Sequence, residues 1–421
     1  MPSVIILGGG LAGLSTAAAL AATHTVTILE SRPHLGGRAT SYEAAGEEID
    51  NCQHILLRCC TNLLDFYTRL GVAQDITFHK EFTFIEPGGR TSLFSAGVLP
   101  RFAGSFLALR FLSLREKLAV ARALRALENE QRDLDNITML EWLQQHHQPP
   151  RAIERFWRQI LVSAINEELD RMAAAHGIQV FKLGFLASRT SYEMGVPAVP
   201  LAQLYRAEAW DKLGNVKIQT RTPVERVVLA DNRVSHVIAA GTEHRADCYV
   251  SALPFERIAS VIPDLPLDLS PFQHSPITGI HLWFDRPITD LPHATLLDRT
   301  IQWMFNKGAG RHIQLVVSAS RSLTEMPRAE VIALALKELA EFFPAAAQAK
   351  LEKAHVVKEV RATFSAAPGL EASRPTAHTP VANLFLAGDW TRSGWPATME
   401  GAVRSGYLAA EALTGQRFLK P

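Results

Sequence analysis

The stretch Val4-Ile5-Ile6-Leu7-Gly8-Gly9-Gly10-Leu11-Ala12-Gly13 decides the fold class. Its apolar, β-branched start predicts a buried strand, and the Ala- and Leu-rich residues that follow predict a helix. Between them, Gly8 permits a tight turn, Gly10 lets a pyrophosphate approach the backbone, and Gly13 lets the helix pack closely on the strand. We expect the N–H groups at the start of the helix, including those of Leu11 and Ala12, to bind phosphate.

A second apolar run, Val26-Thr27-Ile28-Leu29, ends at Glu30. An acid at this distance from the glycines accepts hydrogen bonds from ribose hydroxyls, so we expect Glu30 and its neighbour Ser31 to lie against a ribose. The glycine pattern alone is weak evidence, because glycine turns are common. Two strands, a helix and an acid in the right order favour a dinucleotide site over an ordinary βαβ unit.

A second glycine pair, Gly36-Gly37, is followed by Arg38. A guanidinium beside flexible backbone suits a second close approach to a doubly charged pyrophosphate, which an NAD dehydrogenase does not need. Together with Glu30, this segment resembles the FAD-binding signature of the flavin amine oxidase and carotenoid desaturase superfamily.

The other half of such a site occurs near the C-terminus, where an apolar run ends in Gly388-Asp389 and Pro396-Ala397-Thr398-Met399 precedes a small-residue helix. The resemblance places Asp389 on the flavin ribityl chain, the start of the helix at the flavin N1/O2 edge, and the backbone of Val224 against adenine. Reduced flavin carries negative charge at that edge, which a helix N-terminus stabilises. Residues 388–401 contain no cysteine, so we expect FAD to be bound noncovalently.

The composition is balanced, with 43 Lys+Arg against 42 Asp+Glu among 421 residues, which argues against a nucleic-acid partner. The four cysteines, Cys52, Cys59, Cys60 and Cys248, show no C-x-x-C spacing, so we expect no metal and a reducing compartment. Met1 leads almost directly into the first strand, and no run of eighteen apolar residues occurs. These features predict a cytoplasmic protein.

We predict an α/β fold in which a Rossmann-like FAD-binding domain of the amine oxidase/desaturase type is interleaved with a mixed α+β substrate domain. The FAD-binding domain takes residues 1–85, 205–260 and 375–421, and the substrate domain takes 86–204 and 261–374. Helical periodicity marks residues 118–127, 139–145, 152–165 and 167–175, and Cys59-Cys60 also lie in a helical pattern. Strand patterns mark residues 82–85, 222–229, 234–239, 248–253, 277–284 and 313–319.

Residues 95–127 combine basic and large apolar side chains. The basic ones are Arg101, Arg110, Arg115, Lys117, Arg122 and Arg125, and the apolar ones are Phe102, Phe106, Leu107, Leu109, Phe111, Leu112 and Leu114. This mixture suits a segment lying in the headgroup layer of an anionic membrane, and it equally suits an ordinary helix pair with a solvated basic face. Both interpretations stay open. The first predicts peripheral association with the inner face of the membrane.

Further segments narrow the resemblance to the bacterial hydroxysqualene dehydroxylases, a squalene-associated FAD-dependent branch of the superfamily. These are residues 49–57, 155–158, 164–167, 199–204, 388–391 and 395–403, and the similarity covers essentially the whole chain. The segment Asp50-Asn51-Cys52-Gln53-His54 is its most distinctive part. Cys52 and Arg58 stand where we expect glycine in that family, which bears on the fine geometry of the substrate pocket.

The resemblance implies that reduced FAD delivers hydride to hydroxysqualene, that the allylic hydroxyl leaves as water, and that squalene results, within squalene and hopanoid biosynthesis. Such chemistry needs an acid, a dry cavity and a positioned flavin. We expect His54 to protonate the hydroxyl, Gln53 to orient it and Asp50 to orient His54. Candidate residues for the hydrocarbon tunnel are Phe156, Trp157, Phe181, Phe185, Leu186, Trp283, Trp303 and Phe305.

The implied partner is a lipophilic isoprenoid, handed over from an enzyme similar to squalene synthase. An oxidative desaturase of a carotenoid-type polyene, or a flavin amine oxidase, shares both half-sites and is the main alternative, although no acidic cluster for an amine cation is evident. Two further hypotheses remain. One is a flavin-dependent mutase without net redox change, and the other is a lipid chaperone that has lost flavin. The retained Gly36-Gly37-Arg38 and Gly388-Asp389 argue against the chaperone.

Overall fold

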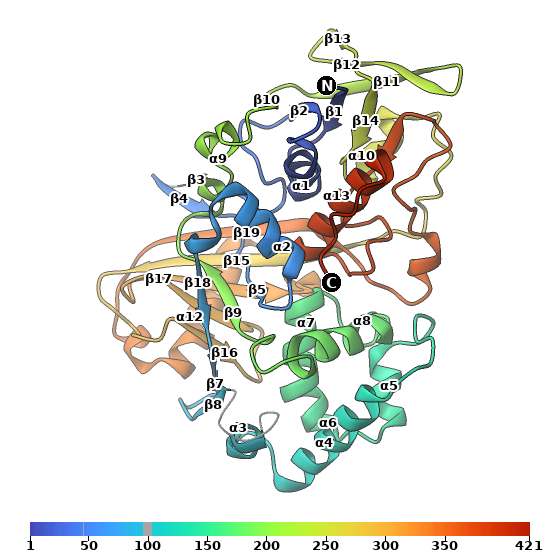
Figure 1. Cartoon of the computed structure of the whole chain (residues 1–421). Coiled ribbons are helices and arrows are strands. Elements are labelled where there is room, and N and C mark those ends of the chain that lie inside the picture. The colour runs from blue at the N-terminus through green and yellow to red at the C-terminus, as the bar shows by residue number, and fades with distance from the viewer. Residues whose placement is uncertain (45, 96–102) are drawn as a thin grey trace.

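The computed structural model describes residues 1–44, 46–95 and 103–421. One layer is a five-stranded parallel sheet in the order β10-β2-β1-β14-β20 (Figure 1). Its strands are β1 (Ser3–Leu7), β2 (Thr25–Leu29), β10 (Val216–Gln219), β14 (Cys248–Ser251) and β20 (Leu384–Leu386). Because all five run in parallel, the turn after β1 and the turn after β20 lie at the same edge of the sheet, which is the edge where α/β folds bind ligands.

Helices α1 (Leu11–Leu20), α2 (Thr61–Leu70) and α13 (Met399–Thr414) pack beside this sheet (Figure 1). All ten residues of α1 are buried, which shows that other elements enclose this helix on every side. At Gly406 of α13, an added Cβ would lie 2.1 Å from Ser15 Oγ and 2.3 Å from the Ala12 carbonyl oxygen. The small residues of both helices therefore allow the close contact that joins the N-terminal and C-terminal segments.

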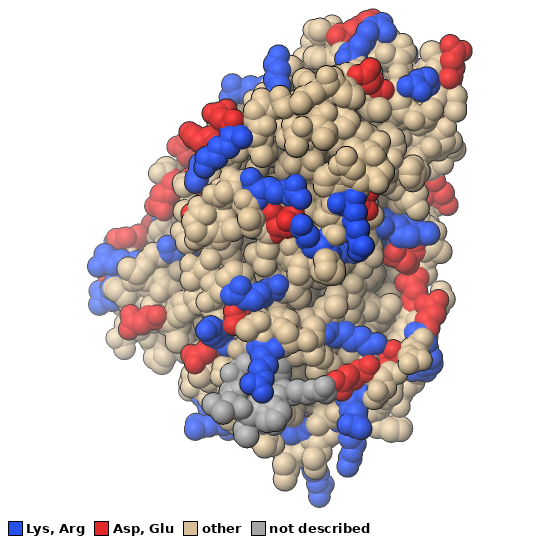
Figure 2. All heavy atoms as spheres, in the orientation of Figure 1, with Lys and Arg blue, Asp and Glu red and all other residues tan. Residues whose placement is uncertain are grey.

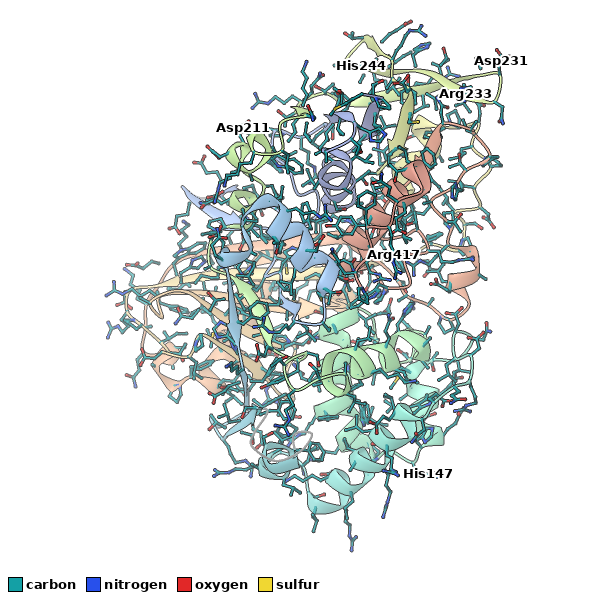
Figure 3. The ribbon with its side chains drawn as sticks, in the orientation of Figure 1. His147, Asp211, Asp231, Arg233, His244 and Arg417 are labelled. Carbon is teal, nitrogen blue, oxygen red and sulfur yellow. The ribbon has the colours of Figure 1, made fainter. Side chains whose placement is uncertain are left out.

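An antiparallel meander extends from the parallel layer at the upper end of Figure 1: β11 (Val224–Ala230), β12 (Arg233–Ala239) and β13 (Thr242–His244). Asp231 and Asn232 form its first turn with φ angles of 49° and 57°. Figure 3 labels Asp231 and Arg233 at this turn and His244 on the last strand. Two smaller sheets connect the layers, and their strands are β3 (Ser41–Ala44), β4 (Glu47–Asp50), β5 (Leu56–Leu57), β6 (Ile76–His79) and β9 (Met194–Pro197).

A second large sheet has seven strands in the order β19-β15-β18-β17-β16-β7-β8. They are β7 (Glu81–Ile85), β8 (Thr91–Ser95), β15 (His274–Phe284), β16 (His293–Leu296), β17 (Trp303–Gly308), β18 (His312–Ser318) and β19 (Leu351–Phe364). Ile280, Leu282 and Leu315 on one face belong to the same core cluster as Val331 and Leu339 of α12 (Arg328–Phe342). The opposite face carries Trp303 and Phe305 into a core cluster shared with the helical lobe.

The helical lobe occupies the lower part of Figure 1. It comprises α3 (Ala103–Ala108), α4 (Leu114–Glu128), α5 (Met139–Gln145), α6 (Pro150–Ala152), α7 (Gln159–Ile165) and α8 (Ala174–Gln179), with π-helical segments at η3 (Ile153–Arg158) and η4 (Val180–Leu186). Short helices elsewhere are η1 (Ala73–Asp75), η5 (Leu201–Tyr205), α9 (Ala207–Asp211), α10 (Phe255–Val261), α11 (Arg321–Thr324), η6 (Pro344–Ala347) and η7 (Leu370–Ser373). In this lobe a π-helical turn feeds directly into α7 and another continues α8.

Two expected helices differ from the structure. The helix expected over 167–175 begins only at Ala174, because Asn166 ends α7 with a φ of 62° and its side chain donates to the Ser275 carbonyl. The buried Glu167 that follows is held by a bidentate ion pair with Arg321. Cys59 and Cys60 precede α2 rather than lying in it, since Cys60 is its N-cap residue.

Candidate active site

The first glycine turn has the open backbone that a phosphate needs. Gly8 adopts a φ of 107°, and a Cβ on Gly13 would lie 2.0 Å from the Gly8 carbonyl oxygen, so the helix packs against the turn itself. Gly10 is the N-cap of α1 without a side-chain cap. The nearest atom to a Cβ built there is the Gly37 Cα, at 3.9 Å. Uncapped N–H groups beside open space form an anion-binding helix N-terminus.

Glu30 is buried at the end of β2 and accepts hydrogen bonds from the Gly9 N–H at 2.6 Å and the Arg32 N–H at 2.7 Å. The Ser31 hydroxyl also donates to it at 3.1 Å. The Glu30 carbonyl accepts from the Thr222 N–H, two residues before Val224. The acid, Ser31 and the start of β11 therefore lie together beside the glycine turn.

The second glycine pair lies against the first. Gly36 and Gly37 have φ angles of 97° and 63°, and the Gly36 N–H donates to the Gly9 carbonyl at 2.9 Å. Gly10 and Gly36 also form an isolated parallel bridge. A Cβ on Gly36 would lie 2.3 Å from the Ala39 carbonyl oxygen, so this position accepts only glycine. The two glycine segments form one continuous backbone surface.

Arg38 links this surface to the C-terminal half-site. Its Nη2 lies 2.5 Å from Asp389 Oδ1, and its Nη1 donates to the Ala362 carbonyl at 3.1 Å. The fully buried Arg374 donates to the backbone carbonyls of Asp389 and Thr391 and so holds the loop that carries the aspartate. Asp389 is thus positioned by one arginine through its side chain and by another through its backbone.

The start of α13 is shaped by Thr398, whose hydroxyl accepts from the Gly401 N–H at 3.0 Å. A Cβ on Gly401 would lie 2.5 Å from the Pro396 carbonyl oxygen, so the turn over Pro396 and the buried Ala397 is compact. The Gly388 N–H donates to Ser405 Oγ, which ties the end of β20 to α13. Asp389 and the N-terminus of α13 therefore face the site together.

The loop carrying Gln53 and His54 is fastened to the Gly36–Arg38 segment by Asn51, whose amide donates to the Arg38 carbonyl at 2.7 Å. His54 Nε2 lies 3.2 Å from Asn51 Oδ1. The orienting contact expected from Asp50 is thus made by Asn51. Asp50 instead accepts from Ser41 at 2.7 Å and from the Leu201 N–H at 2.9 Å, because it is the last residue of β4 and points toward β3 and η5.

Lys307 of β17 also belongs to this site, although no sequence motif marks it. Its Nζ lies 3.2 Å from Asp50 Oδ2 and 3.1 Å from Gln53 Oε1. Burial lowers the pKa of His54 to about 4; the charge of Lys307 adds to that shift and the charge of Asp50 opposes it. His54 is therefore mainly a neutral imidazole at pH 7, so the protonation of a hydroxyl expected of it would depend on a small protonated fraction that grows as the pH falls.

A cavity of about 590 Å³ begins beside this loop and the start of α13. Ile55, Pro396, Thr398 and Met399 line one part of it, and the helical lobe lines the rest. Of the residues expected to form a hydrocarbon tunnel, five line the cavity: Phe156, Phe181, Phe185, Leu186 and Trp303. The wall is predominantly aliphatic and aromatic, which is typical of a site for a hydrophobic ligand.

The other three expected tunnel residues do not line this cavity. Trp157 is fully buried and donates to Gln148, Trp283 packs with Ile49 and donates to Glu47, and Phe305 packs within the sheet against Trp303. Cys52 is buried beside Gly279, and Arg58 pairs with Glu193 and lies 3.7 Å above the Phe78 ring. Neither Cys52 nor Arg58, which stand where glycine was expected, lines the cavity.

The family profile described as flavin containing amine oxidoreductase matches residues 11–414. The chain belongs to this family. The family description implies a flavin, and both glycine segments, Arg38, Asp389 and the α13 N-terminus provide the backbone approach and the polar groups that a flavin dinucleotide needs. Among the residues that the structure describes, no group of three His, Cys, Asp or Glu side chains could hold a metal ion.

This flavin oxidoreductase is similar to enzymes that act on carotenoids. It is 29% identical to a 15-cis-phytoene desaturase of an Oncidium hybrid cultivar over 97% of this chain and 77% of that protein. A 15-cis-phytoene desaturase of Synechococcus elongatus is 27% identical (98% and 96%), and a zeta-carotene desaturase of Synechocystis is 25% identical (97% and 96%). These relatives indicate a carotenoid-desaturase type of flavin oxidoreductase, a broader class than the hydroxysqualene dehydroxylases.

Solved structures support the fold. An oxidoreductase from Methanosarcina mazei superposes with a TM-score of 0.75 at 16% identity, covering 98% of this chain and all of that one. A putrescine oxidase bound to putrescine superposes with a TM-score of 0.74 at 16% identity, covering 99% of both chains. At this identity the likeness establishes the amine oxidase type of fold, an FAD-binding layer with a mixed α/β substrate region.

Proposed function

We propose that this flavin oxidoreductase acts on a long isoprenoid chain and that its reaction is the reductive removal of the hydroxyl of hydroxysqualene, giving squalene. The observation that carries the isoprenoid substrate is the cavity, whose apolar wall starts at Ile55 and Met399 beside the flavin half-sites and continues through the helical lobe. An elongated hydrocarbon fits a wall of this kind because its binding depends on buried apolar surface.

In this reaction a C–O bond breaks, a C–H bond forms at the same allylic carbon, and the hydroxyl leaves with a proton as water. Bound flavin in its reduced form supplies the hydride, and an external two-electron donor must restore it. The apolar wall excludes water from the carbon on which positive charge develops. The loop of Gln53 and His54, held by Asn51 and Lys307, supplies hydrogen-bonding groups for the departing oxygen.

A second candidate, oxidative desaturation of a carotenoid-type polyene, is favoured by the names of the relatives, which are phytoene and zeta-carotene desaturases. It uses the same cavity with the opposite flow of electrons: two hydrogens leave the substrate and reduce the flavin. Amine oxidation is less supported. The acids that line the cavity are Glu128 and Glu400, and Glu400 already accepts from the Leu63 N–H at 2.7 Å and the Asn62 amide at 2.8 Å.

A single-turnover experiment separates these reactions. Photoreduced enzyme is mixed anaerobically with hydroxysqualene, and oxidised enzyme is mixed with phytoene. Dehydroxylation predicts reoxidation of the flavin with one squalene formed per flavin in the first mixture and no reduction in the second. Flavin reduction by phytoene, with no reaction of hydroxysqualene, would instead establish the desaturase. Product formation without any change of flavin redox state would indicate a mutase.

We further propose that the protein loads its substrate from the inner face of the cytoplasmic membrane, receiving it from an enzyme similar to squalene synthase. Leu107, Leu114 and Leu118 of α3 and α4 line the cavity yet are 59%, 66% and 49% exposed. Lys and Arg side chains project around the same lower end of the molecule (Figure 2). No helix in the described part of the chain is long and apolar enough to cross a membrane. Arg101 and Phe102 of the expected docking segment lie outside the described residues.

A further inference from the structure

The wall of the cavity is predominantly apolar, and among its polar side chains two neutral ones lie together on α7. Gln159 and Ser163 are four residues apart, so they lie on the same face of the helix, and both line the cavity. The π-helical segment η3 leads directly into Gln159. π-helical turns are frequent at functional sites, which makes this pair a candidate for a functional role.

The hydroxyl of Ser163 can only accept a further hydrogen bond. It donates its one proton to the Gln159 carbonyl at 2.7 Å and accepts from the Trp303 indole N–H, also at 2.7 Å. A serine hydroxyl has one proton and two lone pairs. One lone pair of Ser163 Oγ therefore remains for a ligand.

The side-chain amide of Gln159 also has an acceptor left for a ligand. Its Nε2 donates to the Gln302 carbonyl at 3.1 Å. Because a carbonyl only accepts, the amide nitrogen must face Gln302 and the amide oxygen Oε1 must point away. No partner for Oε1 occurs among the hydrogen bonds of the described residues. The pair thus offers two acceptors, and the amide of Gln159 keeps one further N–H, so a hydroxyl, which both donates and accepts, matches it.

A neutral alcohol matches this pair better than an ammonium ion. Lys117 and Arg125 line the cavity together with Glu128 and Glu400, so the charges of the wall balance and give an ammonium ion no net attraction. Glu400, an acid of the wall, is engaged with the N-terminus of α2. A hydrocarbon, in turn, would leave both acceptors buried without a partner, which costs free energy.

We propose that Gln159 and Ser163 form an alcohol-binding subsite that holds the hydroxyl of a long isoprenoid alcohol as it enters the cavity, before the hydroxyl reaches the Gln53–His54 loop. This inference rests on the proposed function, because it assumes an isoprenoid in the cavity. The pair accepts the hydroxyl proton of the ligand while the chain lies along the apolar wall. It makes the cavity selective for an isoprenoid alcohol over the hydrocarbon with the same carbon skeleton.

The test measures binding without turnover. Purified holoenzyme with oxidised flavin is loaded with radiolabelled squalene in detergent micelles, and the label is displaced by unlabelled hydroxysqualene or unlabelled squalene. We expect hydroxysqualene to displace the label at about 5- to 10-fold lower concentration than squalene does. This ratio corresponds to one to two net hydrogen bonds. In Gln159→Leu and Ser163→Ala proteins this preference should fall to about one, with squalene binding retained.

Ile160→Val is the matched control, since Ile160 lines the same cavity from the same helix. It should change binding of both ligands alike and keep their ratio. Equal competition by the two ligands in the wild-type protein would overturn the subsite, as would an unchanged preference in both variants. Stronger competition by an amine of the same skeleton would show that the pair selects a cation. A retained alcohol preference in an enzyme that fails the single-turnover experiment would refute only the proposed reaction.

Discussion

The guanidinium of Arg38 and the carboxylate of Asp389 lie 2.5 Å apart, although 351 residues separate them in the chain. Each belongs to one half of the candidate flavin site, and Asp389 is buried. An ion pair in this position is costly to break, because removal of one partner leaves the other charge poorly solvated. The ion pair therefore fixes the positions of the N-terminal and C-terminal half-sites relative to each other.

Arg38→Ala and Asp389→Ala should each weaken flavin binding by at least 30-fold, since truncation of one partner of a buried charge pair costs about 2–5 kcal/mol. The ratio of flavin to protein absorbance after purification and dialysis measures the loss. Arg286→Ala, which removes an exposed ion pair with Asp285, is the control and should keep full flavin content. Acid precipitation of the wild-type protein should release all flavin to the supernatant. Flavin that stays on the polypeptide would contradict noncovalent binding.

His54→Phe should leave flavin content and dithionite reduction unchanged and slow reoxidation of reduced flavin by hydroxysqualene by about 10²–10⁴-fold, the usual effect of losing a general acid. Gln53→Ala should act in the same direction with a smaller effect, because the role proposed for Gln53 is only to orient the hydroxyl. Stopped-flow absorbance under anaerobic conditions measures both rates. A wild-type rate in the His54→Phe protein would assign proton delivery to another group.

Lys307→Met should move the pH dependence of that rate toward higher pH. The positive charge of Lys307 contributes to lowering the pKa of His54 below 6.5, so its removal raises the pKa and increases the protonated fraction at pH 5–6. Lys307→Arg keeps a positive charge and should keep the wild-type profile. An identical profile in all three proteins would show that His54 does not control the reaction.

Changing Arg110, Arg115 and Arg122 to Glu should weaken binding to anionic liposomes by at least tenfold, because each basic residue near such a surface contributes about 1 kcal/mol. Sedimentation with vesicles measures the effect, and the flavin spectrum should stay intact. The control changes Arg226, Arg233 and Arg245 to Glu in the meander, or directly after it, at the opposite end of the molecule (Figure 1). Equal losses in both triple variants would show that net charge alone governs the binding.

The free energy of unfolding should fall as the pH decreases from 6.5 to 4. Burial lowers the pKa of His293 to about 4, so the unfolded chain binds a proton in this range that the folded chain does not. This histidine contributes on the order of 3 kcal/mol to the loss. His293→Leu should flatten the profile measured by urea unfolding, whereas His378→Leu, at an exposed site, should not. A slope unaffected by His293→Leu would contradict the neutral state of this histidine.

The glycine turns of the two half-sites could be predicted from sequence because their physics is local. Gly8, Gly36 and Gly388 have φ angles of 107°, 97° and 142°, and short motifs encode such turns directly. Residues whose roles depend on distant packing could not be predicted. Lys307 meets Asp50 only because β17 of the second sheet faces the end of β4. Trp283 and Trp157 resemble tunnel residues in sequence, yet their indole N–H groups bind Glu47 and Gln148 away from the cavity.

The complete burial of α1 has a consequence for biosynthesis. Its ten residues are hidden from solvent partly by α13, which includes Gly406 and is translated almost 400 residues later. At about 5–20 residues per second, the ribosome takes roughly 20 to 80 seconds to reach that segment. During this interval the nascent chain carries an apolar helix that lacks its final cover. The N-terminal nucleotide-binding unit should therefore need a chaperone until the last helix emerges.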